Sequence, residues 1–281
     1  MDGPDSRSSA APGVRLFRLW SIDVRLDPSV LLVFGLVVMG LGDGLFRAWH
    51  PDWSRAQSWG VGAAAALLFF AALLAHEFAH ARVAQQFGIR VRGITLFLFG
   101  GVAEVARDAD TPRAELLIAL AGPAASLALA FAFAALAEAG LSESALKTLA
   151  SDPLAALAGS APWISVCLWL ASVNLTLALF NLVPGFPLDG GRVLRALVWH
   201  RTGDLIKASR VATRAGRWFG WFLMGFGVWR LVSAGDLGGL WYVLIGWFLG
   251  HLARASHIEL LARQRALQGQ AWWFDDRFDP R

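Results

Sequence analysis

The stretch VGAAAALLFFAALLAHEFAH, residues 61–80, carries both the main fold signal and the main chemical signal of this sequence. Its first part, Val61–Ala75, is an unbroken apolar run. A helix needs about 20 apolar residues to cross roughly 30 Å of hydrocarbon. Two further long apolar runs follow, at Leu116–Ala137 and Trp163–Val183. The sequence therefore predicts an integral membrane protein built mainly from helices.

The composition supports the same class of protein. The 281 residues are 56% hydrophobic and 16% charged, whereas soluble domains average about 45–50% apolar and about 25% charged residues. The net charge is +4, but the basic residues stand between apolar runs, where they orient helices in a membrane, so we predict no nucleic-acid partner. The single cysteine, Cys167, excludes an internal disulfide and any metal site built from several thiolates.

Hydropathy and charge together predict the topology. Six membrane spans are expected, at roughly 28–46, 60–82, 114–138, 162–183, 214–234 and 237–254. The last two could instead form a re-entrant hairpin. Of the 25 Lys and Arg residues, 21 fall on one side of this six-span topology. The basic side of a membrane protein is normally cytoplasmic, so we predict a multi-pass protein of the cell membrane with both termini in the cytoplasm.

The remaining segments complete the predicted organisation. We divide the chain into a disordered N-terminal segment at 1–14, a membrane domain at 15–255 and a cytoplasmic C-terminal tail at 256–281. Between Phe87 and Val105, β-prone residues are interrupted by Arg and Gly, which predicts a small hairpin or sheet bent at Gly100–Gly101. The predicted fold class is an all-α membrane protein with six transmembrane helices and a small cytoplasmic-side β hairpin or sheet.

The motif His76-Glu77-Phe78-Ala79-His80 has the HExxH pattern and continues the apolar helix. Residues four positions apart share one helix face, so both imidazoles can reach one metal ion. Glu77 lies beside them, close enough to polarise a metal-bound water. Ionisable groups in a membrane span are costly and usually functional. A pair of structural core histidines and a metal site without proteolytic activity are the alternatives.

A catalytic zinc ion needs a third protein ligand and one open coordination position. The segment NLVPGFPLDGG, Asn181–Gly191, supplies Asp189 on a bent stretch after the fourth span. Its prolines stop the helix and its glycines let the chain turn tightly. In the predicted topology Asp189 and the two histidines lie at compatible depth. The alternative is that Asp189 caps the next helix and pairs with Arg192.

HEFAH followed by NLVPGFPLDGG resembles the site-2 protease family of intramembrane metalloproteases. The similarity includes LFGGVA at Leu98–Ala103 and AGPAAS at Ala121–Ser126, and it covers roughly residues 15–255. Many members of the family carry Asn where this chain has Ser126, so the role of that position stays open. This resemblance implies that the chain is an enzyme with one zinc ion.

The resemblance also implies roles for individual residues. The zinc ligands would be His76, His80 and Asp189. Glu77 would be the general base, and Asn181 would contact the substrate backbone or the developing oxyanion. The family cleaves membrane-spanning helices of regulatory proteins, which implies single-span membrane protein substrates in the lipid bilayer.

Three further possibilities complete the hypotheses. A metal-ion transporter would also place His and acidic residues in spans, but the candidate ligands lie at one depth and form no relay. A non-proteolytic homologue could bind membrane helices, but metal binding alone would not need Glu77. The segment Phe97–Val102 could hold an unwound substrate by adding a strand to it, or it could be a structural hairpin.

Overall fold

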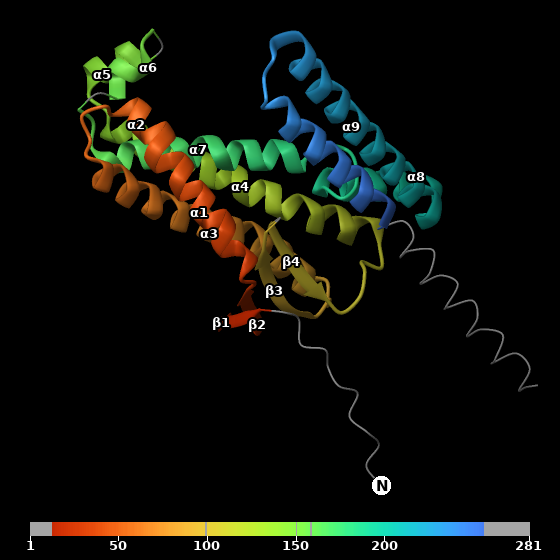
Figure 1. Ribbon diagram of the computed structural model, residues 1–281. Coiled ribbons are helices and arrows are strands. Elements are labelled where there is room, and N and C mark those ends of the chain that lie inside the picture. The colour runs from red at the N-terminus through yellow and green to blue at the C-terminus, as the bar shows by residue number, and fades with distance from the viewer. Residues whose placement is uncertain (1–12, 99, 150, 158, 256–281) are drawn as a thin grey trace, which may run out of the picture. The chain divides into compact units, whose positions relative to one another are not determined.

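The computed structural model describes residues 13–98, 100–149, 151–157 and 159–255, which are mostly helical with one four-stranded sheet (Figure 1). The chain divides into two compact units. Unit 1 is Met1–Asp108 with Ala124–Leu177, and unit 2 is Ala109–Pro123 with Ala178–Arg281. The predicted N-terminal segment at 1–14 lies outside the described residues except for its last two positions, and the predicted tail at 256–281 lies wholly outside them.

Among the described helices, four are long and apolar enough to cross a membrane, and they coincide with the first four predicted spans. They are Ser29–Trp49, Arg55–Gln86, Pro112–Gly140 and Pro162–Asn181. The first consists of α1 (Ser29–Met39), a π-helical turn (Gly40–Leu45) and α2 (Phe46–Trp49), and the others are α3, α4 and α7. The helix α3 begins at Arg55, and the hydroxyl of its N-cap residue, Ser54, accepts a hydrogen bond from the N–H group of Gln57.

Helices also form at the last two predicted spans, but their membrane crossing is not confirmed. The helix α9 (Leu205–Ala234) begins well before the predicted start, because Asp204 accepts hydrogen bonds from the N–H groups of Ile206 and Lys207. Its first half carries the basic residues Lys207, Arg210, Arg214 and Arg217. The chain then forms another helix over 239–255.

The sheet has the strand order β1-β2-β3-β4. Its strands are β1 (Val14–Leu19), β2 (Ile22–Leu26), β3 (Val91–Phe97) and β4 (Gly100–Val105). The predicted β hairpin is confirmed as β3 and β4, which pair antiparallel, with Phe97 opposite Gly100. The strand β2 pairs with β3 in parallel, because α1, α2 and α3 form the long connection that a parallel pair requires.

The strands β1 and β2 were not predicted. They form an antiparallel hairpin whose turn is Trp20-Ser21, and both residues have positive φ angles, 48° and 64°. Two-residue hairpin turns that require positive φ usually contain Asn, Asp or Gly, so this turn has no recognisable sequence signal. Alternate side chains of β2 are fully buried, at Ile22 and Val24, and anchor the hairpin in unit 1.

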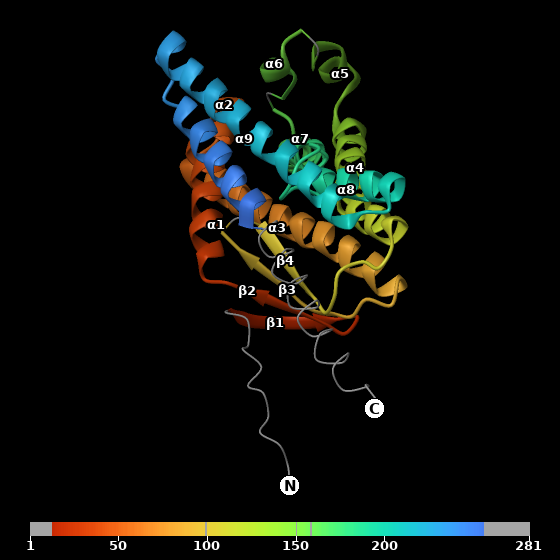
Figure 2. The same cartoon turned by 90° about the vertical axis from the view of Figure 1, so that its right-hand side faces the viewer.

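Unit 1 places the sheet beside α3, and the short helices α5 (Glu143–Leu149) and α6 (Pro153–Leu157) lie at the opposite end (Figures 1 and 2). A cluster around Phe46 and Leu170, both fully buried, packs α2 and α7 together at that end. A second cluster of Val30, Leu73 and Leu96 joins α1, α3 and β3. The sheet is therefore fixed to the half of α3 that carries the HExxH motif.

Unit 2 contains α8 (Asp189–Thr202), α9 and the helix at 239–255. The last two helices pack closely through glycines. A Cβ atom at Gly220 would meet the carbonyl oxygen of Gly246 at 2.6 Å, and one at Gly227 would meet that of Gly239 at 2.5 Å. The absence of side chains at these positions lets the two backbones touch.

Candidate metal centre

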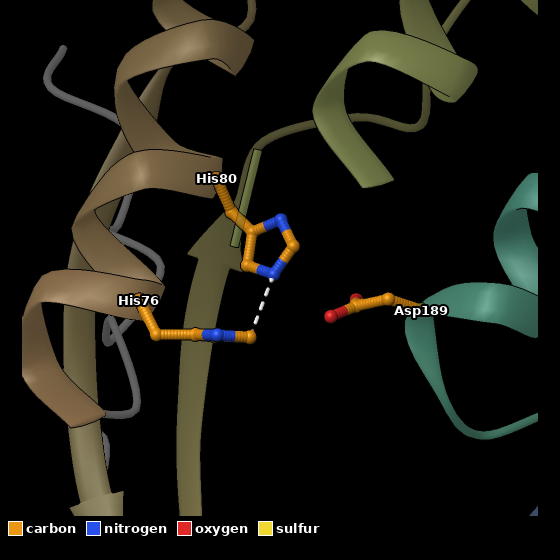
Figure 3. Close-up of side chains that lie close together, drawn as sticks. All are labelled: His76, His80 and Asp189. Atoms are coloured by element: carbon orange, nitrogen blue, oxygen red, sulfur yellow. Dashed lines mark hydrogen bonds between the residues drawn. The ribbon is translucent and has the colours of Figure 1, made fainter. Parts of the chain in front are cut away.

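The helix α3 places the two histidines of the HExxH motif on one face, one turn apart. Both are buried, with 3% of His76 and 7% of His80 exposed. Their Nε2 atoms lie 3.2 Å apart (Figure 3). Tetrahedral zinc with Zn–N distances of about 2.0–2.1 Å holds two nitrogens about 3.3 Å apart. The spacing of the pair therefore fits a shared zinc ion.

Asp189 is the first residue of α8. Each of His76, His80 and Asp189 offers one ligand atom, and these atoms all lie within 4.8 Å of one another. Figure 3 shows the Asp189 carboxylate directed toward the two imidazole rings. Two imidazole nitrogens and one carboxylate oxygen are a donor set that catalytic zinc sites use, with the fourth position open. The three residues together could hold a zinc ion.

The start of α8 bears on the alternative role of Asp189. The N-cap residue of α8 is Leu188, which has extended backbone angles. No side-chain hydrogen bond is made from this N-cap position. Asp189 therefore lies inside the first turn and not at the N-cap. A carboxylate in the first turn is favoured by the positive end of the helix dipole.

The glycines before and inside α8 serve a different purpose from the one predicted. A Cβ atom at Gly185 would meet the backbone of Gly216 on α9 at 2.5 Å, and one at Gly191 would meet the backbone of Phe186. Neither glycine has the positive φ angle that a glycine-dependent turn requires. They are needed because the chain segments lie too close for a side chain. This packing fixes the segment from which Asp189 projects in unit 2.

Glu77 lies against the strand β4. A Cβ atom built on Gly101 would come within 2.7 Å of Glu77 Cδ and 3.0 Å of Glu77 Oε1. Ordinary van der Waals separations are about 3.5–4.0 Å, so no larger residue fits there without moving the glutamate. The predicted bend is at Gly100, which has a φ angle of +130°. Gly101 instead makes room for the Glu77 side chain.

Ser126 provides a contact that sequence reasoning left open. Its Oγ atom lies 2.8 Å from Nδ1 of His76, and the serine is fully buried on α4. The signal for this residue was a hydroxyl in an otherwise apolar helix. Asn181 is the last residue of α7 and lies in unit 2. Its predicted role at the active site stays a prediction.

Sequence reasoning missed a buried ion pair in unit 2. The Glu115 carboxylate, at the start of α4, accepts hydrogen bonds from Nε and a terminal nitrogen of Arg195 on α8. Glu115 is 1% exposed. The guanidinium also lies over the ring of Phe186, at 5.1 Å from its centre. An acidic residue at the edge of a long apolar run was the available signal.

These observations define a multi-pass membrane protein with a group of side chains suited to a metal ion. The model of peptidase family M50 matches residues 64–223, which is more than half of the chain and includes both motifs. The chain therefore belongs to peptidase family M50. This confirms the resemblance to site-2 proteases that HEFAH and NLVPGFPLDGG indicated.

Individual relatives agree with this assignment. The chain is 45% identical over 251 residues to the zinc metalloprotease Rip3 of Mycobacterium tuberculosis, covering 89% of this chain and 60% of the relative. It is 39% identical over 243 residues to the zinc metalloprotease sll0528 of Synechocystis, covering 86% of this chain and 59% of the relative. The chain thus spans about 60% of the length of these curated relatives.

A solved structure shows the same fold. The site-2 protease from Methanocaldococcus jannaschii matches with a TM-score of 0.55 at 23% sequence identity. The match covers 86% of this chain and 94% of that chain.

Proposed function

We propose that this chain is an intramembrane zinc metalloprotease that cleaves transmembrane segments of single-span, membrane-anchored regulatory proteins. The observation that carries the proposal is the group of His76, His80 and Asp189, whose ligand atoms lie within 4.8 Å of one another in a chain of peptidase family M50. Relatives named zinc metalloproteases support zinc as the metal, with one ion per chain.

Each residue of the proposed site would have its own role in peptide hydrolysis. A zinc ion held by His76, His80 and Asp189 would supply Lewis-acid chemistry, which activates water and a substrate carbonyl near neutral pH. Glu77 takes the proton of the attacking water and passes it to the leaving amine. Gly101 leaves the space that Glu77 occupies beside β4. Asn181 donates a hydrogen bond to the developing oxyanion.

The substrate must unwind before it can be cut, because a helix keeps its carbonyl groups within its own hydrogen bonds. Among the strands that the structure describes, β4 lies at the edge of the sheet and pairs with β3 alone. An edge strand offers free N–H and C=O groups that can pair with an extended peptide. We therefore propose that β4 holds the unwound part of the substrate by strand addition.

The sheet register identifies which groups of β4 face the open edge. The N–H group of Asp27 donates to the carbonyl of Leu96, so Leu96 faces β2. Backbone groups of successive strand residues point to opposite sides, so the neighbouring Thr95 faces β4. Thr95 is paired with Val102, which therefore points its N–H group back at β3. Ala103, one residue on, presents its N–H group to the open edge.

The finer topology is also proposed. The apolar second half of α9 and the helix at 239–255 would form the fifth and sixth spans of a protein in the cell membrane. The uneven distribution of Lys and Arg supports a cytoplasmic position for both termini. The basic first half of α9 would then lie at the cytoplasmic surface.

The group of candidate ligands also bears on the transporter alternative. Over the described part of the chain, His76, His80 and Asp189 are the one group of at least three His, Cys, Asp or Glu residues close enough to share an ion. A transporter would need further sites along a path across the bilayer. The single group favours catalysis at one position.

The deciding experiment is a cleavage assay in liposomes with single-span substrates, which compares the wild type with Glu77→Gln. The substitution removes the base and keeps the three proposed ligands, so cleavage should be lost while zinc content stays close to that of the wild type. Cleavage by Glu77→Gln at the wild-type rate would rule out the assigned mechanism.

A further inference from the structure

We propose that Ser126 is a positioning residue for the metal centre, and that its hydroxyl fixes the His76 ring so that Nε2 is available to the metal. This inference rests on the proposed function, because it takes His76 as a ligand. It begins from one contact within unit 1. The Oγ atom of Ser126 lies 2.8 Å from Nδ1 of His76, between α4 and α3.

Both residues of this contact are buried, so loss of the hydrogen bond should be costly. Ser126 is fully buried and His76 is 3% exposed, so water cannot easily replace either partner. A buried polar group that lacks a hydrogen bond is costly. The hydroxyl therefore constrains the orientation of the ring and supplies a partner for Nδ1.

The same bond selects the tautomer of His76. A neutral imidazole carries one proton, on Nδ1 or on Nε2. The Nε2 atoms of His76 and His80 lie 3.2 Å apart, so these are the two nitrogens that could bind one shared ion. A ligand nitrogen needs its lone pair, so the proton must be on Nδ1. The Nδ1–H group then donates a hydrogen bond to the Ser126 hydroxyl. This bond favours the tautomer in which Nε2 has no proton and keeps its lone pair for the metal.

Metal-binding histidines commonly need such an acceptor. Their second ring nitrogen usually donates to a carboxylate, a carbonyl or water, and loss of the acceptor typically lowers metal affinity about 10–100-fold. A serine hydroxyl is a neutral acceptor, so it orients His76 without adding a negative charge beside the ion. The expected loss for Ser126→Ala is in that range of about 10–100-fold.

Unit 1 offers a matched control. Ser165 on α7 is also fully buried, and its Oγ atom lies 2.7 Å from Nε2 of His50, which is 1% exposed. This serine–histidine bond joins α7 to the end of α2, away from the HExxH motif. Ser165→Ala therefore removes a bond of the same kind and the same burial without touching His76.

The test measures metal binding by the purified full chain in detergent, without substrate. Zinc affinity is measured by competition with a chelator, and the ligand environment by the visible absorption of bound Co²⁺. Ser126→Ala should bind zinc about 10–100-fold more weakly and should shift the Co²⁺ spectrum. Ser126→Thr and Ser126→Asn each keep an acceptor oxygen, and at least one should restore both properties. Ser165→Ala should match the wild type in both.

The outcomes separate this inference from the proposed function. If Ser126→Ala binds zinc as tightly as the wild type with the same Co²⁺ spectrum, the positioning role is overturned and the protease proposal stands. Equal losses in Ser126→Ala and Ser165→Ala would also overturn it, because they would indicate general destabilisation. If the wild type binds no zinc, both the proposed function and this inference fail.

Discussion

Arg195 donates a hydrogen bond from Nε to the Glu115 carboxylate at 2.6 Å, in a region of unit 2 where the glutamate is 1% exposed. Arg195 lies less than two helical turns after Asp189 on α8. Its guanidinium also contacts the ring of Phe186, in the segment that leads into α8. The ion pair therefore holds the start of α8, and with it Asp189, against the start of α4.

Glu115→Ala should destabilise the fold strongly. It removes the partner of the Arg195 guanidinium, whose side chain is only 14% exposed, and breaking a largely buried ion pair typically costs up to about 3–5 kcal/mol. The measurement is thermal unfolding of the purified protein in detergent. Asp236→Ala, which removes the partner of the much more exposed Arg230, should shift the midpoint far less. Equal shifts of the unfolding midpoint in the two variants would show that the Glu115–Arg195 pair stabilises the fold no more than the more exposed Arg230–Asp236 pair does.

Gly101→Ala should reduce cleavage while zinc binding stays intact. The added Cβ atom must push the Glu77 side chain away from its position beside β4. A displacement of about 1 Å at a catalytic group can cost about 100-fold in rate. Gly60→Ala, on the same helix as Glu77 and with nothing within 4 Å of its added Cβ atom, should retain activity. Unchanged turnover in Gly101→Ala would mean that Glu77 is not positioned by β4.

Asp189→Ala should lower both metal affinity and activity, because two imidazoles alone leave zinc undercoordinated. Asp189→Asn should disturb folding less than Asp189→Ala does, but it should remain a poor catalyst, since the amide lacks the negative charge of the carboxylate. The measurement is zinc content after dialysis against a weak chelator. Asp204→Ala is the carboxylate control in unit 2, since it removes the cap of α9 and should affect stability without changing metal affinity. Full zinc occupancy in Asp189→Ala would place the third ligand elsewhere.

Ala103→Pro should impair cleavage of helical substrates if β4 captures them by strand addition. Proline removes the N–H group that faces the open edge, whereas Ala103→Ser keeps it. Zinc content and thermal stability should be similar in the two variants, and cleavage should be much slower in the proline variant. Val102→Pro would be a poor test, since Val102 pairs with Thr95 inside the sheet. Equal cleavage by folded Ala103→Pro and Ala103→Ser would leave the β3–β4 hairpin with a structural role.

The proposed topology predicts which surface positions are accessible from outside the cell. In a Cys167→Ala background, a cysteine at Ser144 should react with an impermeant thiol reagent added to intact cells, whereas one at Thr202 should react only after lysis. Both positions are exposed in the structure, so accessibility reports the side of the membrane. Labelling at Thr202 in intact cells would overturn the six-span topology.

The local patterns of the sequence determined much of this protein. Long apolar runs predict the helices that become α1 to α4 and α7, because burying a helix in hydrocarbon needs only length and apolar character. The spacing of His76 and His80 places both on one face, because residues four apart share a helix face. The pairing of β3 with β4 also follows from neighbouring segments. All of these features depend on residues close together in the chain.

Only the tertiary structure decided how distant residues support the site. The hydrogen bond between His76 and Ser126 joins residues 50 positions apart, and the bond between Glu115 and Arg195 joins residues 80 positions apart. The closeness of Glu77 to Gly101 and the β1–β2 hairpin were not visible in the sequence either. Such contacts depend on how helices and strands pack side by side, and a local pattern of residue types does not specify which buried polar groups will meet.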